Sequence, residues 1–553
     1  MTKNFDIYSS VKNIFSRTWA FRYLFLKYKF YKETKNKLRR QLTYNDESIS
    51  SITLKAGKKI FIPLIESSHY QFYQILGLAK ALQMRGATVK VLLCGSSLNG
   101  CELKSVRSHK VDPCLTCRFN KNNTIPLFDL DTIVLSDLIS AEQASEARSK
   151  AIAIAKEYPN SYLFEGIDII PMVNDSVVRY YYGAIPDESS EEIATVRASH
   201  IETAILNFVA GKRIYSEWKP DIVMGNMNVY SIWEPYFKIL SNFKNIEYKI
   251  ISMSTFNYNS VVVNRLDIYK NSKRFNQWLK NRRSLFLNDS EKEELNRFLK
   301  KRFAGGSQIF IDNKLFEPQS NLIEKLNIDT SKRNIFLFTN IYWDVGLSET
   351  GSLYKSVIDW VLNTIELVRG LPNCHVFIKT HPAEVFDSTP SLKGVIQFIL
   401  DKYVEIPKNI TIIRPEFKIK AYELFPFIDL GIVYNGTLGL EMLTKNIPVV
   451  VTGLAPYGYL DSVQCPQSIS EYKEILTGKV AALLPNPDEV ELFSYFYFIK
   501  TLLPWTLTEK AYSGEFKEFT FNTLDEIVPG KDKYLDHLCN CILNADDTII
   551  ENW

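Results

Sequence analysis

Three apolar runs in the second half of the chain each end in a short polar turn, and helical patterns separate them. The runs lie between residues 334 and 434 and have the length of buried strands. Strands that alternate with helices form parallel sheets, in which the carboxyl ends of the strands lie along one edge. The pattern therefore predicts that the turns at residues 339–344, 381–384 and 435–441 meet at one edge of a sheet.

The third turn breaks from its strand straight into a helix on small residues, Asn435 to Gly439. Free backbone N–H groups and the helix dipole at such a start favour a phosphate or diphosphate. Glu441, one turn into the helix, is placed to hydrogen-bond ribose hydroxyls. Close packing alone would also explain Gly436 and Gly439, so the prediction depends on the three turns acting together.

The first half of the chain shows the same alternation of strands and helices. Apolar runs at residues 58–65 and 88–94 flank an amphipathic stretch that ends at Gly86, which predicts a strand–helix–strand unit. His69 follows the first of these runs, where a side chain can face a site at the carboxyl edge. Histidine is the usual general base near neutral pH, so His69 is a candidate for that role. A helix-capping or structural role stays open.

A chain of 553 residues is too long for a single core. The repeated pattern predicts two Rossmann-like domains of the α/β class. We expect a basic aromatic N-terminal segment at residues 1–50, a first domain at 51–300, a second domain at 301–485, and C-terminal helices at 486–553 that pack back on the first domain.

Basic residues are concentrated in the N-terminal segment. Residues 1–50 contain eleven Lys and Arg against four Asp and Glu, which leaves a net charge of −3 on the other 503 residues. The nearly neutral charge of residues 51–553 argues against an enzyme that acts on nucleic acid, because such an enzyme would carry basic residues on its folded domains.

Aromatic and basic residues alternate between residues 11 and 40. In a helix this combination suits a lipid headgroup layer, and the alternatives are a solvated or domain-packed helix and RNA binding. The chain shows no secretory signal and no apolar window of about 18 residues, so we expect a cytoplasmic protein, peripheral on the inner face of the membrane if the segment docks.

Four of the eight cysteines, Cys94, Cys101, Cys114 and Cys117, lie within 24 residues. The spacing of the last pair lets two thiolates bind one metal ion, and His109 is an alternative ligand. A structural zinc site is one prediction, and reduced thiols or a disulfide or redox pair are the alternatives. The pattern does not predict a catalytic metal, which would keep an open coordination position.

The three turns resemble motifs of the capsule polysaccharide biosynthesis glycosyltransferases, which are related to Kdo-transferring and polysialic-acid-type enzymes. T-N-I-Y-W-D (339–344) is similar to the family's T-N-x-x-W-D, and I-K-T-H-P-A-E (378–384) to its H-P motif. V-Y-N-G-T-L-G-L-E with K-N-I-P-V-V-V-T-G-L-A-P-Y (433–457) is similar to its S-T-x-G-L-E … G-K-P-V-I-x-x-G block. The resemblance covers residues 334–475 well and the first half diffusely. Asn435-Gly436 departs from it, because the family has hydroxyl residues there.

The resemblance implies a GT-B fold, in which two Rossmann-like domains face a cleft. The first would hold the acceptor and the second the donor nucleotide. It implies transfer of a sugar from a nucleotide-activated donor, CMP-Kdo-like or UDP-linked, to a surface or capsular polysaccharide or glycolipid, without a catalytic metal. His381 joins His69 as a candidate catalytic residue. The nucleotide would contact residues of all three motifs: Thr339, Asn340, Asp344, His381, Pro382, Glu384, Asn435, Gly436, Thr437 and Glu441.

Two other functions stay open for such a chain. One is a GT-B enzyme with different chemistry, such as a sugar-nucleotide epimerase or a polyol-phosphate polymerase. The other is a catalytically silent polysaccharide-assembly protein.

Overall fold

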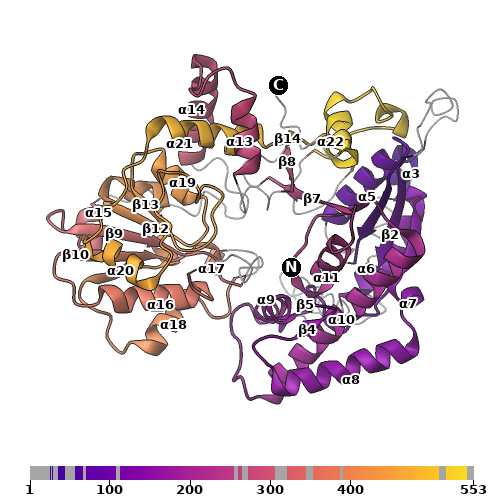
Figure 1. Cartoon of the computed structure of the whole chain (residues 1–553), viewed down its shortest axis with the longest axis horizontal. Helices are drawn as coiled ribbons and strands as arrows, with labels where there is room; N and C mark the ends of the chain where they lie inside the picture. Colours follow the sequence, from indigo (N-terminus) through magenta and orange to yellow (C-terminus); the bar gives the residue numbers. More distant parts are fainter. Residues whose placement is uncertain are drawn as a thin grey trace, which may run out of the picture.

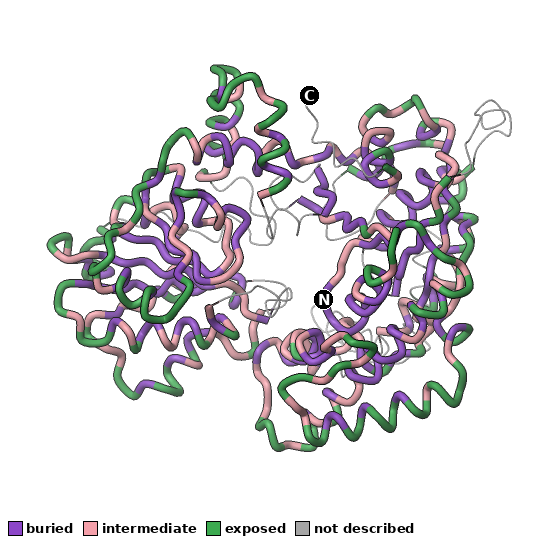
Figure 2. The backbone as a smooth tube through the Cα atoms, viewed as in Figure 1, coloured by how far each residue is buried: buried purple, intermediate pink, exposed green. Residues whose placement is uncertain are grey.

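The computed structural model of the chain has two lobes, and each lobe has its own sheet with helices packed against it (Figure 1). The strands run through the buried centre of each lobe, whereas the outer face of a helix such as α8 (Ala141–Glu157) is exposed (Figure 2). The structure describes residues 25, 28, 35–43, 57–65, 70–107, 113–254, 260–264, 272–304, 321–343, 353–386, 390–509 and 518–544. The predicted α/β class with two Rossmann-like domains is confirmed.

Within the described residues, the first sheet has seven strands in the order β14-β8-β7-β6-β1-β2-β3. All its pairings are parallel except those made by β8. The two apolar runs predicted in this half are β1 and β2, joined through α5 (Tyr70–Gln83). The strands are β1 (Lys59–Pro63), β2 (Thr88–Leu93), β3 (Asp131–Val134), β6 (Ile222–Gly225), β7 (Glu247–Met253), β8 (Ser260–Val263) and β14 (Leu503–Pro504).

Helices cover both faces of the first sheet. Alternation along β1 sends Ile60 and Ile62 to one face and Phe61 to the other, and all three are fully buried. Both faces are therefore apolar, as a covered parallel sheet requires. One face packs on α5, α6 (Cys114–Asn123) and α22 (Lys533–Leu543), and the other on α8, α9 (Ile170–Tyr180), α10 (Glu191–Trp218) and α11 (Tyr230–Ser241).

The second sheet is parallel throughout and has the order β11-β10-β9-β12-β13 within the described residues. Its strands are β9 (Arg333–Phe338), β10 (Cys374–Lys379), β11 (Ile410–Ile413), β12 (Leu430–Val433) and β13 (Val449–Val451). One face packs on α16 (Val357–Val368), α18 (Val395–Lys402) and α20 (Ile469–Thr477). The other packs on α14 (Asp289–Phe303), η7 (Ala421–Phe427), α19 (Leu438–Leu443) and α21 (Pro487–Tyr495). The predicted strands in this half are all present.

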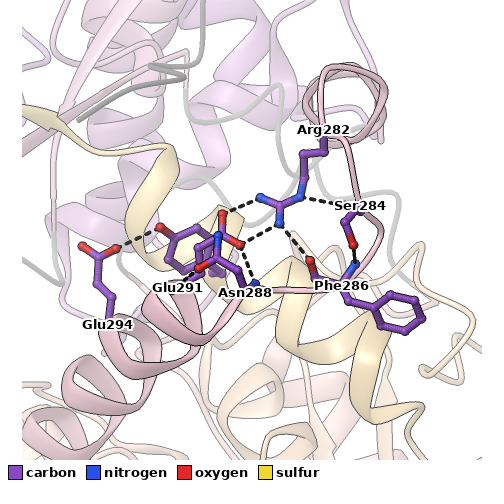
Figure 3. Close-up of polar contacts among 7 residues, drawn as sticks. Arg282, Ser284, Phe286, Asn288, Glu291 and Glu294 are labelled. Carbon is purple, nitrogen blue, oxygen red and sulfur yellow. Dashed lines mark hydrogen bonds and ion pairs between the residues drawn. The ribbon is translucent and has the colours of Figure 1, made fainter.

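A hairpin of α13 (Lys273–Lys280) and α14 precedes the expected boundary at residue 301, yet it packs in the second lobe. Arg282 holds the connection between the two helices (Figure 3). Its guanidinium donates to both carboxylate oxygens of Glu291 at 2.7 Å, and to the carbonyl oxygens of Ser284 and Phe286 at 3.1 Å. These hydrogen bonds stabilise the hairpin, which belongs to the second lobe.

The chain returns to the first lobe after α21 and a π-helical turn, η8 (Phe496–Lys500). β14 then pairs with β8, and α22 packs beside α5 (Figure 1). Of the N-terminal segment, the structure describes residues 25, 28 and 35–43, which include the helix α3 (Asn36–Gln41). Gln41 Nε2 donates to the carbonyl oxygens of Phe519 and Phe521 at 2.9 and 2.7 Å, so α3 is attached to the returning segment.

The rest of the predicted aromatic, basic helix lies outside the described residues. In the part of the chain that is described, no helix combines the length and the apolar character of a membrane span.

Candidate functional site

Three polar turns follow the neighbouring strands β10, β9 and β12 at the carboxyl edge of the second sheet. The middle turn lies beside both others. Thr339 Oγ1 accepts a hydrogen bond from the backbone N–H of His381 at 3.1 Å. Asn340 Nδ2 lies 3.9 Å from the position that a Cβ on Gly436 would occupy. The structure therefore brings the three turns together, although Asp344 lies outside the described residues.

The edge that carries these turns faces the first lobe. Tyr342, in the turn after β9, donates its hydroxyl hydrogen to the carbonyl oxygen of Gly183 at 2.8 Å. The rings of Trp343 and Tyr182 lie edge to face, with centroids 4.9 Å apart. Leu392, in the loop after β10, donates its N–H to the carbonyl oxygen of Tyr182 at 3.0 Å. Loops from two adjacent strands thus dock on the segment that follows α9.

The first lobe contributes a loop to the same junction. Arg107 lies in the segment that follows β2, and it donates to the carbonyl oxygen of Pro390 at 2.6 Å. Its guanidinium lies 4.6 Å from the ring centroid of Tyr182, and that of Arg179 lies 4.9 Å from the ring of Trp343. In each lobe, a loop that follows the carboxyl end of a parallel strand therefore extends toward the opposite lobe. This is the arrangement of a GT-B-like fold.

His381 is held in a defined orientation at this edge. Its Nδ1 accepts a hydrogen bond from the backbone N–H of Ala383 at 3.2 Å. Because an accepting Nδ1 carries no proton, the proton of the neutral ring is assigned to Nε2. The carbonyl oxygen of Pro382 accepts from Phe386 at 3.0 Å and so starts the short helix α17 (Ala383–Phe386). The imidazole is thus able to donate from Nε2.

The carboxylate of Glu384 is engaged inside the second lobe. Both of its oxygens lie 3.3 Å from the backbone nitrogen of Val395, at the start of α18. Burial raises the pKa of Glu384 to about 7, and the carboxylate of Glu416 adds to the shift. A Cβ at Gly394 would lie 2.7 Å from Oε2 of Glu384, so a larger residue there would displace this carboxylate. A contact between Glu384 and a nucleotide stays a prediction.

Glu441 forms a buried ion pair that the sequence did not indicate. Its carboxylate, in a residue that is 1% exposed, accepts from Nε of Arg302 at 2.6 Å. Arg302 comes from the last turn of α14, and its Nη2 lies 3.5 Å from Oγ1 of Thr437. The second carboxylate oxygen, Oε2, is buried and has no hydrogen-bond partner among the described residues. A contact between Glu441 and a ribose hydroxyl stays a prediction.

The two glycines of the third turn differ in what surrounds them. A Cβ at Gly439 would lie 2.0 Å from the hydroxyl oxygen of Tyr457, so close packing requires this glycine. A Cβ at Gly436 would meet nothing closer than 3.9 Å. The open space beside Gly436, next to Asn340 and the half-buried Asn435, is where a ligand can approach the backbone.

Of the predicted catalytic base and metal ligands, the structure describes only the four cysteines. His69 lies outside the described residues. Cys94 follows β2, Cys101 lies in the loop after it, and Cys114 and Cys117 lie on α6. None of the four is in a disulfide within the described residues. Burial raises the pKa of Cys101 well above its usual value, with Cys94 and Cys117 adding to the shift.

No three His, Cys, Asp or Glu side chains of the described part of the chain are arranged to hold a metal ion. His109, the alternative ligand, is not in that part. The zinc site stays a prediction, which the metal content of the purified chain tests.

No known protein family and no curated protein matches this sequence. Among solved structures, the KpsC β-Kdo 2,4 transferase of Thermosulfurimonas dismutans is similar at 14% identity and TM-score 0.34, over 50% of this chain and 79% of that one. A sucrose-phosphate synthase from Thermosynechococcus elongatus is similar at 12% identity and TM-score 0.27, over 80% and 94%.

The UDP-GlcNAc 2-epimerase of Neisseria meningitidis is similar at 11% identity and TM-score 0.21, over 80% and 99%. Sequence identities and TM-scores this low do not indicate which reaction the protein catalyses.

Proposed function

We propose that the protein is a glycosyltransferase that moves a sugar from a nucleotide-activated donor to a surface or capsular polysaccharide or glycolipid. The donor is a CMP-Kdo-like sugar or a UDP-sugar. The observation that carries this proposal is the meeting of three polar turns at the carboxyl edge of the second sheet, opposite the first lobe. In open parallel sheets, ligands bind at this edge.

The donor nucleotide would lie on the three turns. His381 would donate from Nε2 to an oxygen of the phosphate, since its Nδ1 is already an acceptor. Glu441 would accept from a ribose hydroxyl, the role expected for the residue one turn into the helix after the third turn. Asn340 and Asn435 would flank the open space at Gly436.

Transfer replaces one bond at the anomeric carbon of the donor. The oxygen of an acceptor hydroxyl bonds to this carbon, the bond from carbon to phosphate oxygen breaks, and the nucleotide leaves with the electron pair. The proton of the hydroxyl passes to a general base, the role proposed for His69. Hydrogen bonds and positive charge at the carboxyl edge lower the barrier because they stabilise the charge that develops on the phosphate.

Activity assays on the full chain test the proposal. The purified protein would be supplied with CMP-Kdo or UDP-sugars, with and without oligosaccharide or glycolipid acceptors, and the released nucleotide measured. We expect release that requires acceptor, and its loss in His381→Ala. The matched control is His537→Ala, whose histidine lies on α22 in the first lobe.

Two outcomes contradict the transferase proposal in different ways. Conversion of the donor sugar without acceptor identifies an epimerase-type enzyme on the same fold. No turnover with any donor, together with no shift of the thermal midpoint by CMP, UDP, GDP or CDP, identifies a silent assembly protein, because a bound nucleotide stabilises the folded state.

A further inference from the structure

Lys379 ends β10 at the point where the candidate nucleotide site begins. It lies in register with Phe338 of β9 and Ile413 of β11, so it sits between two strands of the sheet. Its carbonyl oxygen accepts a hydrogen bond from the backbone N–H of Thr339 at 3.1 Å. The residue is 5% exposed. A cationic side chain is therefore buried directly beneath the turns after β9 and β10.

The alternation of side chains along a strand places Lys379 on the same face as Phe377. Phe377 stacks on Phe336, with ring centroids 4.5 Å apart, and both belong to the cluster that packs under η7 and α14. The residues opposite Lys379 on the two adjacent strands, Phe338 and Ile413, are apolar. The surroundings of the ammonium group are thus largely unable to stabilise its charge.

Among the described residues, no carboxylate forms an ion pair with Lys379, although Glu423 acts on it from a distance. Its Nζ makes no hydrogen bond or ion pair with any described residue. The acidic residue that acts on it is Glu423 of η7, whose Oε1 accepts from the backbone N–H of Lys420 at 3.2 Å. Burial lowers the pKa of Lys379 to about 8, and the carboxylate of Glu423 opposes this shift.

A buried lysine without an ion pair costs folding free energy, because the ammonium group loses its hydration and gains nothing in return. Such a residue is tolerated where a ligand supplies the missing charge. At the carboxyl edge of a parallel sheet, next to backbone N–H groups, the ligand that fits is the phosphate of a nucleotide. An oxyanion close to the amine favours its protonated form.

We propose that Lys379 forms the ion pair with the nucleotide phosphate and takes up a proton from solvent when the phosphate binds. No covalent bond changes, because the amine gains a proton from the buffer and becomes an ammonium group that pairs with a phosphate oxygen. This role rests on the proposed function. It adds that Lys379 is the residue that binds the phosphate and that a proton is taken up with the nucleotide.

Proton uptake depends on how much of Lys379 is neutral before binding. With a pKa of about 8, roughly half of the amines are neutral at pH 8 and only a few per cent at pH 6.5. The uptake attributable to Lys379 is therefore about half a proton per nucleotide at pH 8 and close to none at pH 6.5.

Isothermal titration calorimetry of the full chain with CMP and with UDP measures this uptake, because the heat changes with the ionisation enthalpy of the buffer. At pH 8 we expect about half a proton for the wild type. Lys379→Met should bind at least tenfold more weakly and show no uptake from this group. Lys379→Arg, which stays charged at every pH, should keep the affinity but lose the uptake.

Two controls keep these variants interpretable. Lys379→Met removes a buried charge at similar volume, so its thermal midpoint should equal or exceed that of the wild type. Lys408→Met changes an exposed lysine just before β11, at the opposite edge of the sheet, and should bind like the wild type.

The outcomes separate this role from the proposed function. If the wild type binds a nucleotide and Lys379→Met binds it equally well with the same uptake, the role of Lys379 is wrong and the nucleotide site stands. If the wild type binds neither CMP nor UDP, nor GDP or CDP added as further probes, both the site and the role of Lys379 are wrong.

Discussion

Replacing Arg302 with methionine should destabilise the second lobe, because it leaves Glu441 as a buried charge without its partner. The Arg302 side chain is 11% exposed and that of Glu441 is 1% exposed, with Nη2 and Oε1 2.5 Å apart. Removing one partner of such a pair costs about 3–5 kcal/mol in the free energy of unfolding. At about 2–4 °C per kcal/mol for a domain of this size, the thermal midpoint should fall by roughly 6–20 °C.

Two further variants isolate the cause. Arg302→Met combined with Glu441→Met removes both charges, so it should recover most of the loss, since apolar residues of similar volume replace a buried pair at little cost. Arg213→Ala breaks an ion pair with Glu217 of 2.7 Å between side chains that are 42% and 53% exposed. That change should cost no more than about 0.5 kcal/mol.

Urea unfolding followed by tryptophan fluorescence gives the free energies for these variants. A loss below about 1 kcal/mol for Arg302→Met would show that the pair behaves like an exposed one. A double variant no more stable than the single one would show that the cost does not come from the unpaired carboxylate. Either result would refute the conclusion that Arg302 stabilises the buried carboxylate of Glu441.

Four further predictions concern single features of the site and the junction. Burial raises the pKa of Glu384 from 4.5 to about 7, so its contribution to stability is complete below about pH 4.5 and is lost as the pH rises through about 7. The free energy of unfolding in urea should therefore fall by about 3 kcal/mol less between pH 4.5 and 8 in Glu384→Gln than in the wild type. The same fall in both proteins would contradict the buried position of Glu384. Gly183→Ala places a Cβ 1.8 Å from a tyrosine hydroxyl of the other lobe, whereas Gly166→Ala, at a similar positive φ, meets nothing within 4 Å. Proteolysis between the lobes should speed up only in the first variant, and equal rates would argue against a packed junction. Gly436→Ala should fold with an unchanged thermal midpoint but bind nucleotide more weakly in calorimetry, because its Cβ enters open space; unchanged affinity would remove this turn from the site. Deletion of residues 1–34 keeps α3 and should abolish pelleting with anionic liposomes while activity on a soluble acceptor persists; unchanged pelleting refutes membrane docking through this segment.

The strands of the second lobe were predictable, because the signals are local, whereas their order across the sheet came from the structure. Apolar runs of strand length, each ended by small or polar residues, recur with helical patterns between them, and parallel strands must then share one carboxyl edge. Thr339, His381 and Gly436 were therefore expected at one edge, and the structure brings their turns together there. The boundary near residue 301 was set by the same pattern, yet α13 and α14 pack in the second lobe.

The partners of the charged residues could not be predicted in this way. Arg302 lies in a basic helix end that is typical of a solvated surface, and its partner Glu441 is 139 residues away. The position of Lys379 at the end of a strand does not show whether it is buried, and the packing of η7 decides this. Glu384 belongs to a motif, but the start of α18 occupies its carboxylate. In each case a segment distant in the sequence determines the burial or the partner of the side chain.

The sequence by itself determined that this chain forms two α/β halves and that the second collects polar turns at one edge, since hydrophobic periodicity and turn residues act over a few positions. Only the tertiary structure decided that this edge faces the first lobe, which of its charges are paired, and that Lys379 is buried without an ion pair among the described residues. The reason is that desolvation and charge pairing depend on every group packed around an atom, and most of those groups come from other parts of the chain.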